Sequence, residues 1–319
     1  MSWQLYSLTF RLKSPLHIGF HKVMHLFRTR PYVLAKPFWG ALTAKLTRQL
    51  GLTDYEKIGE FLKKAMRFGY FYPSVEDKVF IPCYTEEGLK FGDLAQIDFE
   101  KRFLSSFAST SIESDSLTAE EGMLHEVEFL SPYTMGGKPV FLKGLLWVSD
   151  FSEEKLSIDF EDDDFLISHD GIQIKFSELV DTLQVGGERK YGFGLLKLDN
   201  KKGINKVDTP KNLKDLGFNG TWEYDGEDII LELKKNEALW SHAYNSDLKI
   251  KGSLEPIVGR DWSDRGAGRK LSSYGLCWTP GSILIEDATF KITRDFGLWE
   301  RQHPPSTRNS MAKKLFTTI

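Results

Sequence analysis

The stretch Val185 to Leu198 reads VGGERKYGFGLLKL and places four glycines within nine residues. Glycine adopts positive φ at no steric cost and lets another backbone approach closely, but it loses more conformational entropy on folding than any other residue. Between its glycine pairs the loop holds two cations and an aromatic ring, Arg189, Lys190 and Tyr191. Some favourable interaction is therefore expected to offset this cost in entropy.

The spacing excludes the two common nucleotide-binding loops. A Walker A loop needs Lys and then Ser or Thr after its second glycine, and neither Gly187 nor Gly192 is followed by lysine. The dinucleotide fingerprint follows a strand and opens a helix, whereas this loop follows a predicted helix and opens a predicted strand. Its N–H groups and cations suit the phosphates of RNA, and Tyr191 suits stacking on a base. A tight turn with solvated charges is the alternative.

Length and composition indicate a folded protein of one or two domains. The 319 residues are 41% hydrophobic and 13% aromatic, which supplies a sizeable core. Cys83 and Cys277 lie far apart without metal-ligand spacing, so we expect neither disulfide nor zinc, and we assign no cofactor or metal. The alternating N-terminus is typical of a strand and not of a signal peptide, and no stretch has the length of a membrane span. We expect a cytoplasmic protein without membrane contacts.

Charge is segregated along the chain. The net charge is −3, which argues weakly against a free-standing nucleic-acid-binding domain. The first 53 residues nevertheless hold eight Lys or Arg and no Asp or Glu, whereas residues 153–164 hold seven acids and one lysine. We expect the acidic run to be a solvated loop between structured parts. The basic N-terminal segment is expected to face either solvent or an anionic partner.

Hydrophobic periodicity predicts a mixed α+β protein. Period-two alternation predicts a strand over Trp3–Lys13, followed by a loop rich in His and Arg. Leucines every fourth residue predict a helix that begins near Pro37 and ends at Gly51. A second helix is predicted to begin with a capping box formed by Thr53 and Glu56.

The rest of the chain reads mainly as strands. Strands and turns are predicted from Tyr70 to Trp147, with an exposed excursion over 107–127, and a short helix over 176–184 leads into the glycine loop. The order strand, helix, strands, helix, strand is that of a ferredoxin-like (RRM-like) βαββαβ unit. We predict an N-terminal ferredoxin-like domain over 1–199, with an insertion at about 80–145, and a linker over 200–210. A smaller β-rich domain is predicted over 211–298, for which a second ferredoxin-like unit is one option. A basic arm is predicted over 299–319.

Five segments carry a resemblance to a known family. They are SPLHIG (14–19), the helix start WGAL (39–42), ESDSLTAEEGMLHEVEF (113–129), GGERKYGFG (186–194) and TPGSILIE (279–286). Together the sequence resembles the RAMP superfamily of CRISPR-associated RNA-binding proteins. The resemblance covers most of the chain and rests on the order of the segments, because no single motif is decisive.

The resemblance implies one or two ferredoxin-like domains, a glycine loop close to bound RNA and a thumb-like hairpin formed by the insertion. Met123 and Leu124 of the thumb would wedge against the guide–target duplex. The RNA-facing residues, taken from the glycine loop by position and from the basic N-terminal segment, would be Gly186, Gly187, Arg189, Lys190, Tyr191, Gly192, Gly194, His17, Arg28, Arg30 and Lys36.

Three roles within the superfamily are open. A repeat-processing endoribonuclease often uses a histidine, for which His17 is the candidate, but it usually carries its glycine loop near the C-terminus, whereas more than a third of this chain follows Gly194. A backbone subunit that cuts target RNA would use an aspartate near metal, for which Asp115 is the nearest candidate. We favour a subunit that caps the 5′ handle of the guide RNA in a type III effector complex. RDWSDRGAGRK (260–270) followed by WTPGSILIE (278–286) is similar to the C-terminal region of such subunits.

The favoured role implies recognition without catalysis. Its partners would be crRNA, other RAMP backbone subunits and the large polymerase-like subunit, with target RNA met indirectly. No catalytic residue is favoured, Asp115 and His17 being the weak candidates. Outside RNA biology, the alternative is a β-rich assembly protein whose glycines and exposed aromatics serve protein contacts only.

Overall fold

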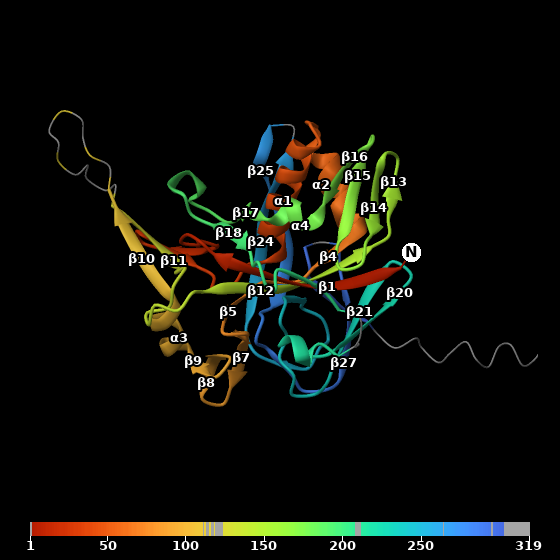
Figure 1. Cartoon of the computed structure of the whole chain (residues 1–319). Helices are drawn as coiled ribbons and strands as arrows, with labels where there is room; N and C mark the ends of the chain where they lie inside the picture. Colours follow the sequence, from red (N-terminus) through yellow and green to blue (C-terminus); the bar gives the residue numbers. More distant parts are fainter. Residues whose placement is uncertain are drawn as a thin grey trace, which may run out of the picture.

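One antiparallel sheet lies at the centre of the molecule (Figure 1). The computed structural model describes residues 2–302 except 111, 113, 114, 116, 117, 119–123, 208–211, 264 and 295. β1 pairs with β12 from Trp3↔Ser149 to Arg11↔Phe141. The sheet has the order β17-β18-β1-β12-β5-β6, with β19 paired to β1 and β4 to β12. Its strands are β1 (Trp3–Leu12), β4 (Met66–Phe68), β5 (Tyr72–Val75), β6 (Lys78–Val79), β12 (Phe141–Ser149), β17 (Thr182–Gln184), β18 (Leu195–Leu198) and β19 (Ile204–Lys206).

Three helices cover one face of this sheet: α1 (Ala35–Gln49), α2 (Tyr55–Ala65) and α4 (Phe176–Val180). The prediction that Gly51 ends the first helix is confirmed, since Gly51 follows Leu50 with a φ of 68°. The predicted capping box is wrong by one residue. The Asp54 carboxylate accepts a hydrogen bond from the Lys57 N–H at 2.9 Å, and Asp54 is therefore the N-cap of α2.

The helix predicted over 176–184 is also shorter than expected. It ends at Val180, because Thr182–Gln184 form β17 and pair with β18. The glycine loop therefore joins two neighbouring antiparallel strands at the edge of the central sheet.

A second, seven-stranded sheet packs on the other face. In Figure 1 its strands β20, β21 and β27 lie below the central sheet, while β24 and β25 extend upward beside the helices. Phe71 and Tyr72 point to opposite faces of the central sheet, because the side chains of adjacent residues in an extended chain alternate. The Phe71 ring stacks on Phe38 of α1, with centroids 4.4 Å apart, while the Tyr72 hydroxyl donates to the Trp240 carbonyl at 2.6 Å. The sheet has the order β20-β21-β27-β28-β22-β25-β24, built from β20 (Thr221–Asp225), β21 (Asp228–Leu233), β22 (Ala243–Tyr244), β24 (Leu254–Ser263), β25 (Gly266–Trp278), β27 (Ala288–Ile292) and β28 (Trp299–Gln302).

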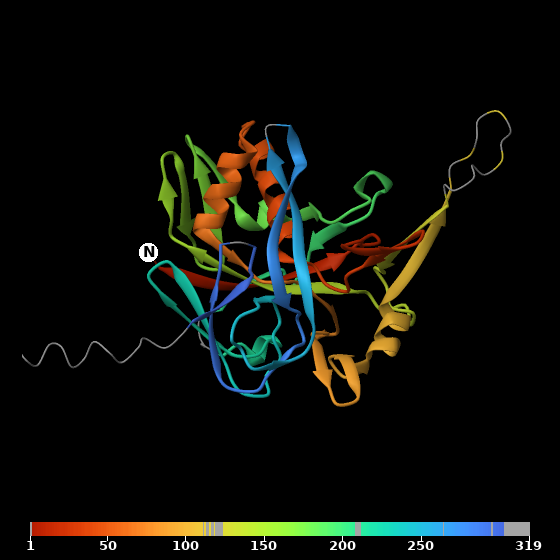
Figure 2. The same ribbon diagram turned by 180° about the vertical axis from the view of Figure 1, so that it is seen from behind.

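The segment rich in His and Arg that follows β1 was predicted to be a loop, and this prediction is wrong because the segment contains two strands. β2 (Gly19–Val23) and β3 (Leu26–Thr29) form a hairpin, and β3 runs parallel to β11 (His125–Leu130). With β10 (Leu104–Ser109) they make a four-stranded sheet of order β10-β11-β3-β2. We call it the thumb sheet. It projects to one side of the central sheet in both views (Figures 1 and 2).

The acidic run is likewise not simply a loop. Leu156 and Ile158 are buried in the strand β14 (Leu156–Phe160), which belongs to a sheet of order β13-β14-β15-β16. The remaining elements are β13 (Ser152–Glu153), β15 (Phe165–His169), β16 (Ile172–Lys175), the sheet β7-β8-β9 (Pro82–Thr85, Gly88–Phe91 and Leu94–Ala95), α3 (Gln96–Phe103) and the pair β23 (Ile250–Lys251) and β26 (Ile283–Leu284). The predicted mixed α+β class is confirmed.

A buried charged network ties the C-terminal sheet to the N-terminal region. The Arg30 guanidinium donates to both Glu255 carboxylate oxygens, at 2.7 and 3.2 Å. His242, whose side chain is fully buried, donates from Nε2 to the same carboxylate and accepts from the Tyr70 hydroxyl at 2.8 Å. Burial alone would raise the pKa of Glu255, but His242 and Arg30 outweigh it and lower that pKa to about 2. Burial lowers the pKa of His242, and Glu255 offsets part of that shift.

The network predicts a specific pH dependence of stability. Both folded pKa values lie below the ordinary values of 4.5 for Glu and 6.5 for His. Each group therefore contributes a stabilisation that is fully present at a pH above its ordinary pKa and is lost as the pH falls. The contribution of His242 is lost below pH 6.5, and that of Glu255 is lost between pH 4.5 and about 2. We expect Glu255→Gln to lower the free energy of unfolding at pH 7 by about 3–5 kcal/mol, because it leaves Arg30 buried without a counter-charge. The variant should also lose less stability than the wild type between pH 4.5 and 2, in urea titrations.

Glu286→Gln is the matched control, because Glu286 pairs with Arg301 at 3.0 Å but is more than a third exposed. Glu286→Gln should lower the free energy of unfolding by clearly less than Glu255→Gln does. Equal losses in the two variants would show that the buried network has no special weight.

Candidate functional site

The glycine loop lies directly on the backbone of residues 14–19. The Gly187 N–H donates to the His17 carbonyl at 2.8 Å, and the Gly194 N–H donates to the Pro15 carbonyl at 2.7 Å. The Leu195 N–H donates to the Ser14 hydroxyl at 2.9 Å. Two motifs some 170 positions apart in the sequence therefore form one structural unit.

Two of the glycines are required by close backbone approaches, Gly186 to residues 14–19 and Gly194 to Val185 at the other end of the loop. A Cβ on Gly186, where φ is 83°, would lie 2.4 Å from the His17 carbonyl oxygen, and one on Gly194, where φ is 80°, would lie 1.8 Å from the Val185 carbonyl oxygen. Gly192 also has positive φ, 82°, but a Cβ there would meet nothing within 4 Å. The packing on residues 14–19 and the pairing of Val185 with Gly194 thus account for the base of the loop and leave its tip unexplained.

The tip presents the two cations and the aromatic ring. Arg189–Tyr191 form a single 3-10 turn, all three residues are exposed, and Tyr191 is 76% exposed. The backbone N–H groups of residues 188–190 have no acceptor within the described chain, and neither Arg189 nor Lys190 has a carboxylate partner there. Gln184 holds the turn in place, since its side-chain amide donates to the Arg189 and Phe193 carbonyls, each at 3.0 Å.

One face of the thumb sheet continues this surface with aromatic and basic side chains. Lys22 lies over the Phe27 ring at 4.6 Å, and the rings of Phe27 and His125 meet edge to face with centroids 6.5 Å apart. Phe129, on the same side of β11 as His125, contacts Phe193 of the glycine loop with centroids 5.6 Å apart. The glycine loop and the thumb sheet therefore form one candidate interface.

His17 lies beneath the glycine loop. Its ring is 7% exposed, and its Nδ1 donates to the Glu128 carbonyl at 2.7 Å. Because Nδ1 carries that proton, Nε2 is the acceptor nitrogen of the neutral ring. His17 thus links the glycine loop to β11 of the thumb sheet, and its burial limits the access of a substrate to Nε2.

The predicted basic residues divide between the two sides of the molecule. Arg28 is on the opposite face of the thumb sheet from Phe27 and pairs with Glu128 at 3.4 Å. Arg30 pairs with Glu255 in the buried network and is not available to a ligand. Lys36 pairs with Asp261 and donates to the Tyr274 hydroxyl at 3.1 Å. Arg30 and Lys36 thus face the β24–β25 hairpin and not the glycine loop.

Two of the remaining candidates, Asp115 and Leu124, lie between β10 and β11. Asp115 is in an exposed turn, and Leu124 is 52% exposed just before β11. Met123 lies outside the described residues. Across the described chain, no three His, Cys, Asp or Glu gather in a way that could hold a metal ion. Nor does any described helix have the length and apolar character to cross a membrane.

Sequence reasoning missed the aromatic face of the thumb sheet. Its residues are Lys22, Phe27, Phe107, His125 and Phe129. The usable signal was the alternation of His125, Val127 and Phe129, of which Val127 is buried. Alternation predicts one strand but not its neighbours, and the parallel pairing of β11 with β3 joins segments about 100 residues apart.

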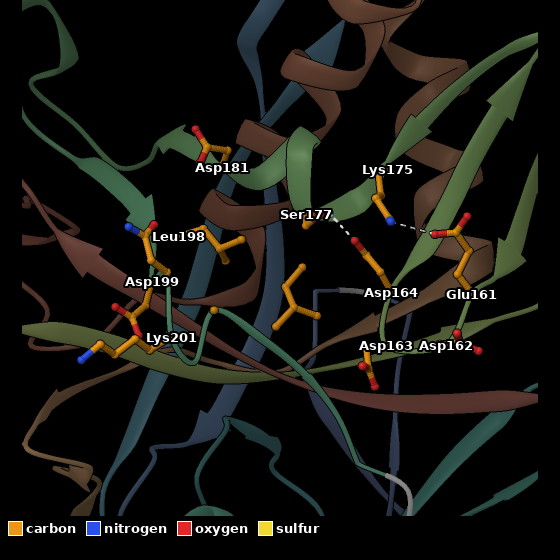
Figure 3. A pocket seen from close by; sticks show the side chains of 13 residues that line it. Glu161, Asp162, Asp163, Asp164, Lys175, Ser177, Asp181, Leu198, Asp199 and Lys201 are labelled. Atoms are coloured by element: carbon orange, nitrogen blue, oxygen red, sulfur yellow. Dashed lines mark hydrogen bonds and ion pairs between the residues drawn. The ribbon is translucent and has the colours of Figure 1, made fainter.

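A separate pocket, shown in Figure 3, has the opposite charge. It has a volume of about 830 Å³, and most of its charged side chains are carboxylates. Asp164 accepts hydrogen bonds from the N–H groups of Phe165 and Ser177, at 2.8 and 3.2 Å, and Lys175 pairs with Glu161 at 3.1 Å. Repulsion between carboxylates and phosphates makes this pocket unsuitable for RNA.

Comparisons with known proteins identify a family and a fold. The model of the RAMP superfamily matches residues 9–197, more than half of the chain. No curated protein matches this chain. A cryo-EM structure of the Type III-B Cmr-beta bound to cognate target RNA and AMPPnP is similar with a TM-score of 0.50 and 11% identity, over 88% of this chain and 85% of that one. This likeness shows a shared fold.

Two further solved structures resemble this chain less closely. A Type III-B Cmr-beta structure bound to cognate target RNA gives a TM-score of 0.48 at 12% identity, over 89% of this chain and 86% of that one. A crystal structure of oligomeric Cmr4 from Pyrococcus furiosus gives 0.28 at 11% identity, over 65% and 100%.

The geometry of the glycine loop predicts unequal effects of two matched substitutions. Gly186→Ala and Gly192→Ala both place a Cβ at a φ near 80°, which costs about 1–2 kcal/mol. Only Gly186→Ala also forces the Cβ against the His17 carbonyl, so we expect it to cost about 1–3 kcal/mol more. Urea unfolding of both variants measures the difference. Equal losses would contradict the close packing of the loop on residues 14–19.

Proposed function

The chain belongs to the RAMP superfamily, and on that premise we propose that it is an RNA-binding subunit of a type III CRISPR effector complex that caps the 5′ handle of the crRNA. The observation that carries the proposal is the exposed tip Arg189–Tyr191, held on residues 14–19 beside the aromatic face of the thumb sheet. The shared fold with Cmr-beta, which in that structure is bound to cognate target RNA, supports the same reading.

The proposed mechanism divides phosphate contacts from base contacts. Arg189, Lys190 and the free N–H groups of the turn bind phosphates, which fixes the position of the RNA without reading its sequence. Tyr191 stacks on a base, and the thumb face offers Phe27 and Phe107 as further stacking surfaces. Stacking of this kind needs bases outside a duplex, and a single-stranded 5′ handle provides them.

The handle-capping role rests on further features of the chain. The segment 260–270, which resembles the C-terminal region of capping subunits, forms most of the β24–β25 tip. We propose the RAMP domain over 1–199, a β-rich domain over 211–298, and Met123 and Leu124 as the thumb wedge against the guide–target duplex. Other RAMP subunits and the polymerase-like subunit would be the protein partners, in the cytoplasm.

We propose that the subunit binds RNA without cutting it. The acceptor nitrogen of His17 lies in a ring that is 7% exposed and covered by Gly187. Asp115 is exposed, and no cluster of metal ligands surrounds it among the described residues. Incubation with repeat-derived RNA, with and without Mg²⁺, should leave the RNA intact. Cutting that His17→Ala abolishes would indicate the processing nuclease, and Mg²⁺-dependent cutting of target RNA that Asp115→Ala abolishes would indicate the backbone subunit.

Removal of the tip cations should weaken binding in a salt-dependent way. We expect Arg189→Ala plus Lys190→Ala to lower affinity for handle RNA and to reduce the slope of log Kd against log salt by roughly 0.7 per lost phosphate contact. Fluorescence anisotropy at four or more salt concentrations measures the slope. Lys234→Ala plus Lys235→Ala, which removes two exposed lysines from the C-terminal region, is the matched control and should leave the slope unchanged. Equal slopes in all three proteins would contradict the proposal.

Loss of the tip ring should weaken binding without a change in the salt slope. Tyr191→Ala removes the stacking of one base, which contributes about 1–3 kcal/mol, or roughly 5- to 150-fold in Kd. Tyr191→Phe keeps the ring and should bind like the wild type. If both variants bind equally well, Tyr191 does not stack on the RNA.

A further inference from the structure

The β24–β25 hairpin has one face on the helices and one in solvent. In Figure 2 it crosses in front of α1 and α2. On its inner face, Asp261 pairs with Lys36 of α1. Near the end of the hairpin the exposed Trp262 stacks on Tyr55 of α2 with centroids 5.3 Å apart. Only the lower end of β25 has a second partner, since β22 pairs with Cys277 and Trp278 alone. The rest is a two-stranded ribbon whose position depends on its inner contacts.

The outer face carries a row of exposed aliphatic side chains. Leu254, Val258, Leu271 and Leu276 are 41%, 52%, 71% and 53% exposed. Arg260 is opposite Leu271 in the register, and Pro256 is opposite Leu276, so all six residues lie on the same face. Exposed apolar side chains that gather on one face, here interrupted only by Ser273 opposite Val258, are typical of a site of interaction, whereas single scattered ones are not.

A bulge in β25 keeps this face apolar. Between the pairs Pro256↔Leu276 and Val258↔Ser273, β25 contains one residue more than β24. Gly275 has a φ of 79° there, as a bulge glycine does. The extra residue lets Tyr274 contact Lys36 and Cys277 lie buried on the inner side, while Leu276 stays exposed on the outer side.

The end of the hairpin is strongly basic. Arg260, Arg265, Arg269 and Lys270 are all exposed, and none forms an ion pair with a described residue. Lys270 is opposite Asp261 in the register and so lies on the inner face, where Asp261 pairs with Lys36, whereas Arg260 and Arg269 belong to the outer face. An occupant of the outer face would therefore meet an aliphatic row that ends in unpaired cations.

These features favour a protein over RNA as the occupant. RNA is bound through cations and aromatic stacking surfaces. The outer row is aliphatic, and the exposed Trp262 near the end of the hairpin is already stacked on Tyr55. Protein interfaces combine an apolar centre with arginine at its margin. Charge complementarity then requires carboxylates on the partner.

We propose that the outer face of the β24–β25 hairpin is the docking surface for a neighbouring protein subunit, whose contact surface is apolar and flanked by carboxylates. The inference rests on the proposed function only in that the neighbour belongs to the same effector complex. The glycine loop and the hairpin would then serve different partners, RNA and protein.

The test is the composition of the intact complex, isolated from its native cells through a C-terminal tag on this chain. Leu271→Glu places a charge in the apolar row, and since Leu271 is 71% exposed the fold should tolerate it. Native mass spectrometry should show about tenfold less of one protein subunit, with the bound RNA retained. Arg260→Glu plus Arg269→Glu, which reverses two exposed cations of the outer face, should release the same subunit. Ile172→Glu, at an apolar position of β16 that is 44% exposed, is the matched control and should release nothing.

A photo-crosslinking residue at position 271 identifies the contact directly, and the crosslinked peptide should be apolar with Asp or Glu beside it. Unchanged composition, loss of RNA alone, crosslinks to RNA or crosslinks only to a second copy of this chain would each overturn the inference. So would a wild-type protein isolated without any protein partner. If the wild-type complex holds no RNA but Leu271→Glu still releases a subunit, the proposed function fails and this inference stands.

Discussion

The candidate interface depends on the segment Lys13–Ile18, whose backbone is hydrogen-bonded on both sides. On one side Pro15 and His17 accept the N–H groups of Gly194 and Gly187. On the other side Leu16 and Leu130 exchange N–H···O=C bonds at 3.0 and 2.8 Å. The segment continues β1, the strand on which the central sheet is built. The glycine loop and the thumb sheet are therefore held by one piece of backbone, and their relative position follows from the central sheet.

This arrangement explains why the glycine loop could be found in the sequence but its geometry could not. Glycine density is a local signal, and it marks a segment whose backbone another segment can approach closely. The partner of that approach, His17, belongs to a distant segment, and no local pattern names it. The same distinction applies to the helices. Spaced leucines and Gly51 located α1, whereas the choice between Thr53 and Asp54 as cap depended on which side chain reached the Lys57 N–H.

Linear charge was a poorer guide, because ion pairing is decided in three dimensions. The basic N-terminal segment predicted a cationic surface, yet Arg28, Arg30 and Lys36 are paired with carboxylates from elsewhere in the chain. The acidic run hid a strand, since the short alternation of Leu156 and Ile158 is flanked on both sides by charged residues. Cations without carboxylate partners among the described residues gather instead at the glycine-loop tip and at the hairpin end. A net charge of −3 is therefore compatible with local surfaces that attract phosphates or carboxylates.

The two surfaces are linked by the residues between them. Thr29 and Arg30 follow each other in the chain. The Thr29 N–H donates to Glu128 of the thumb sheet at 2.9 Å, and Arg30 binds Glu255 at the base of the hairpin. A buried ion pair such as Arg30–Glu255 tolerates little displacement, because separating its charges in a low-dielectric interior is costly. If the outer face of the hairpin binds a protein subunit and the glycine loop binds RNA, this short connection holds both partners in a fixed relation to each other. That rigidity is what a capping subunit requires, since it must set the position of the RNA end relative to its neighbours.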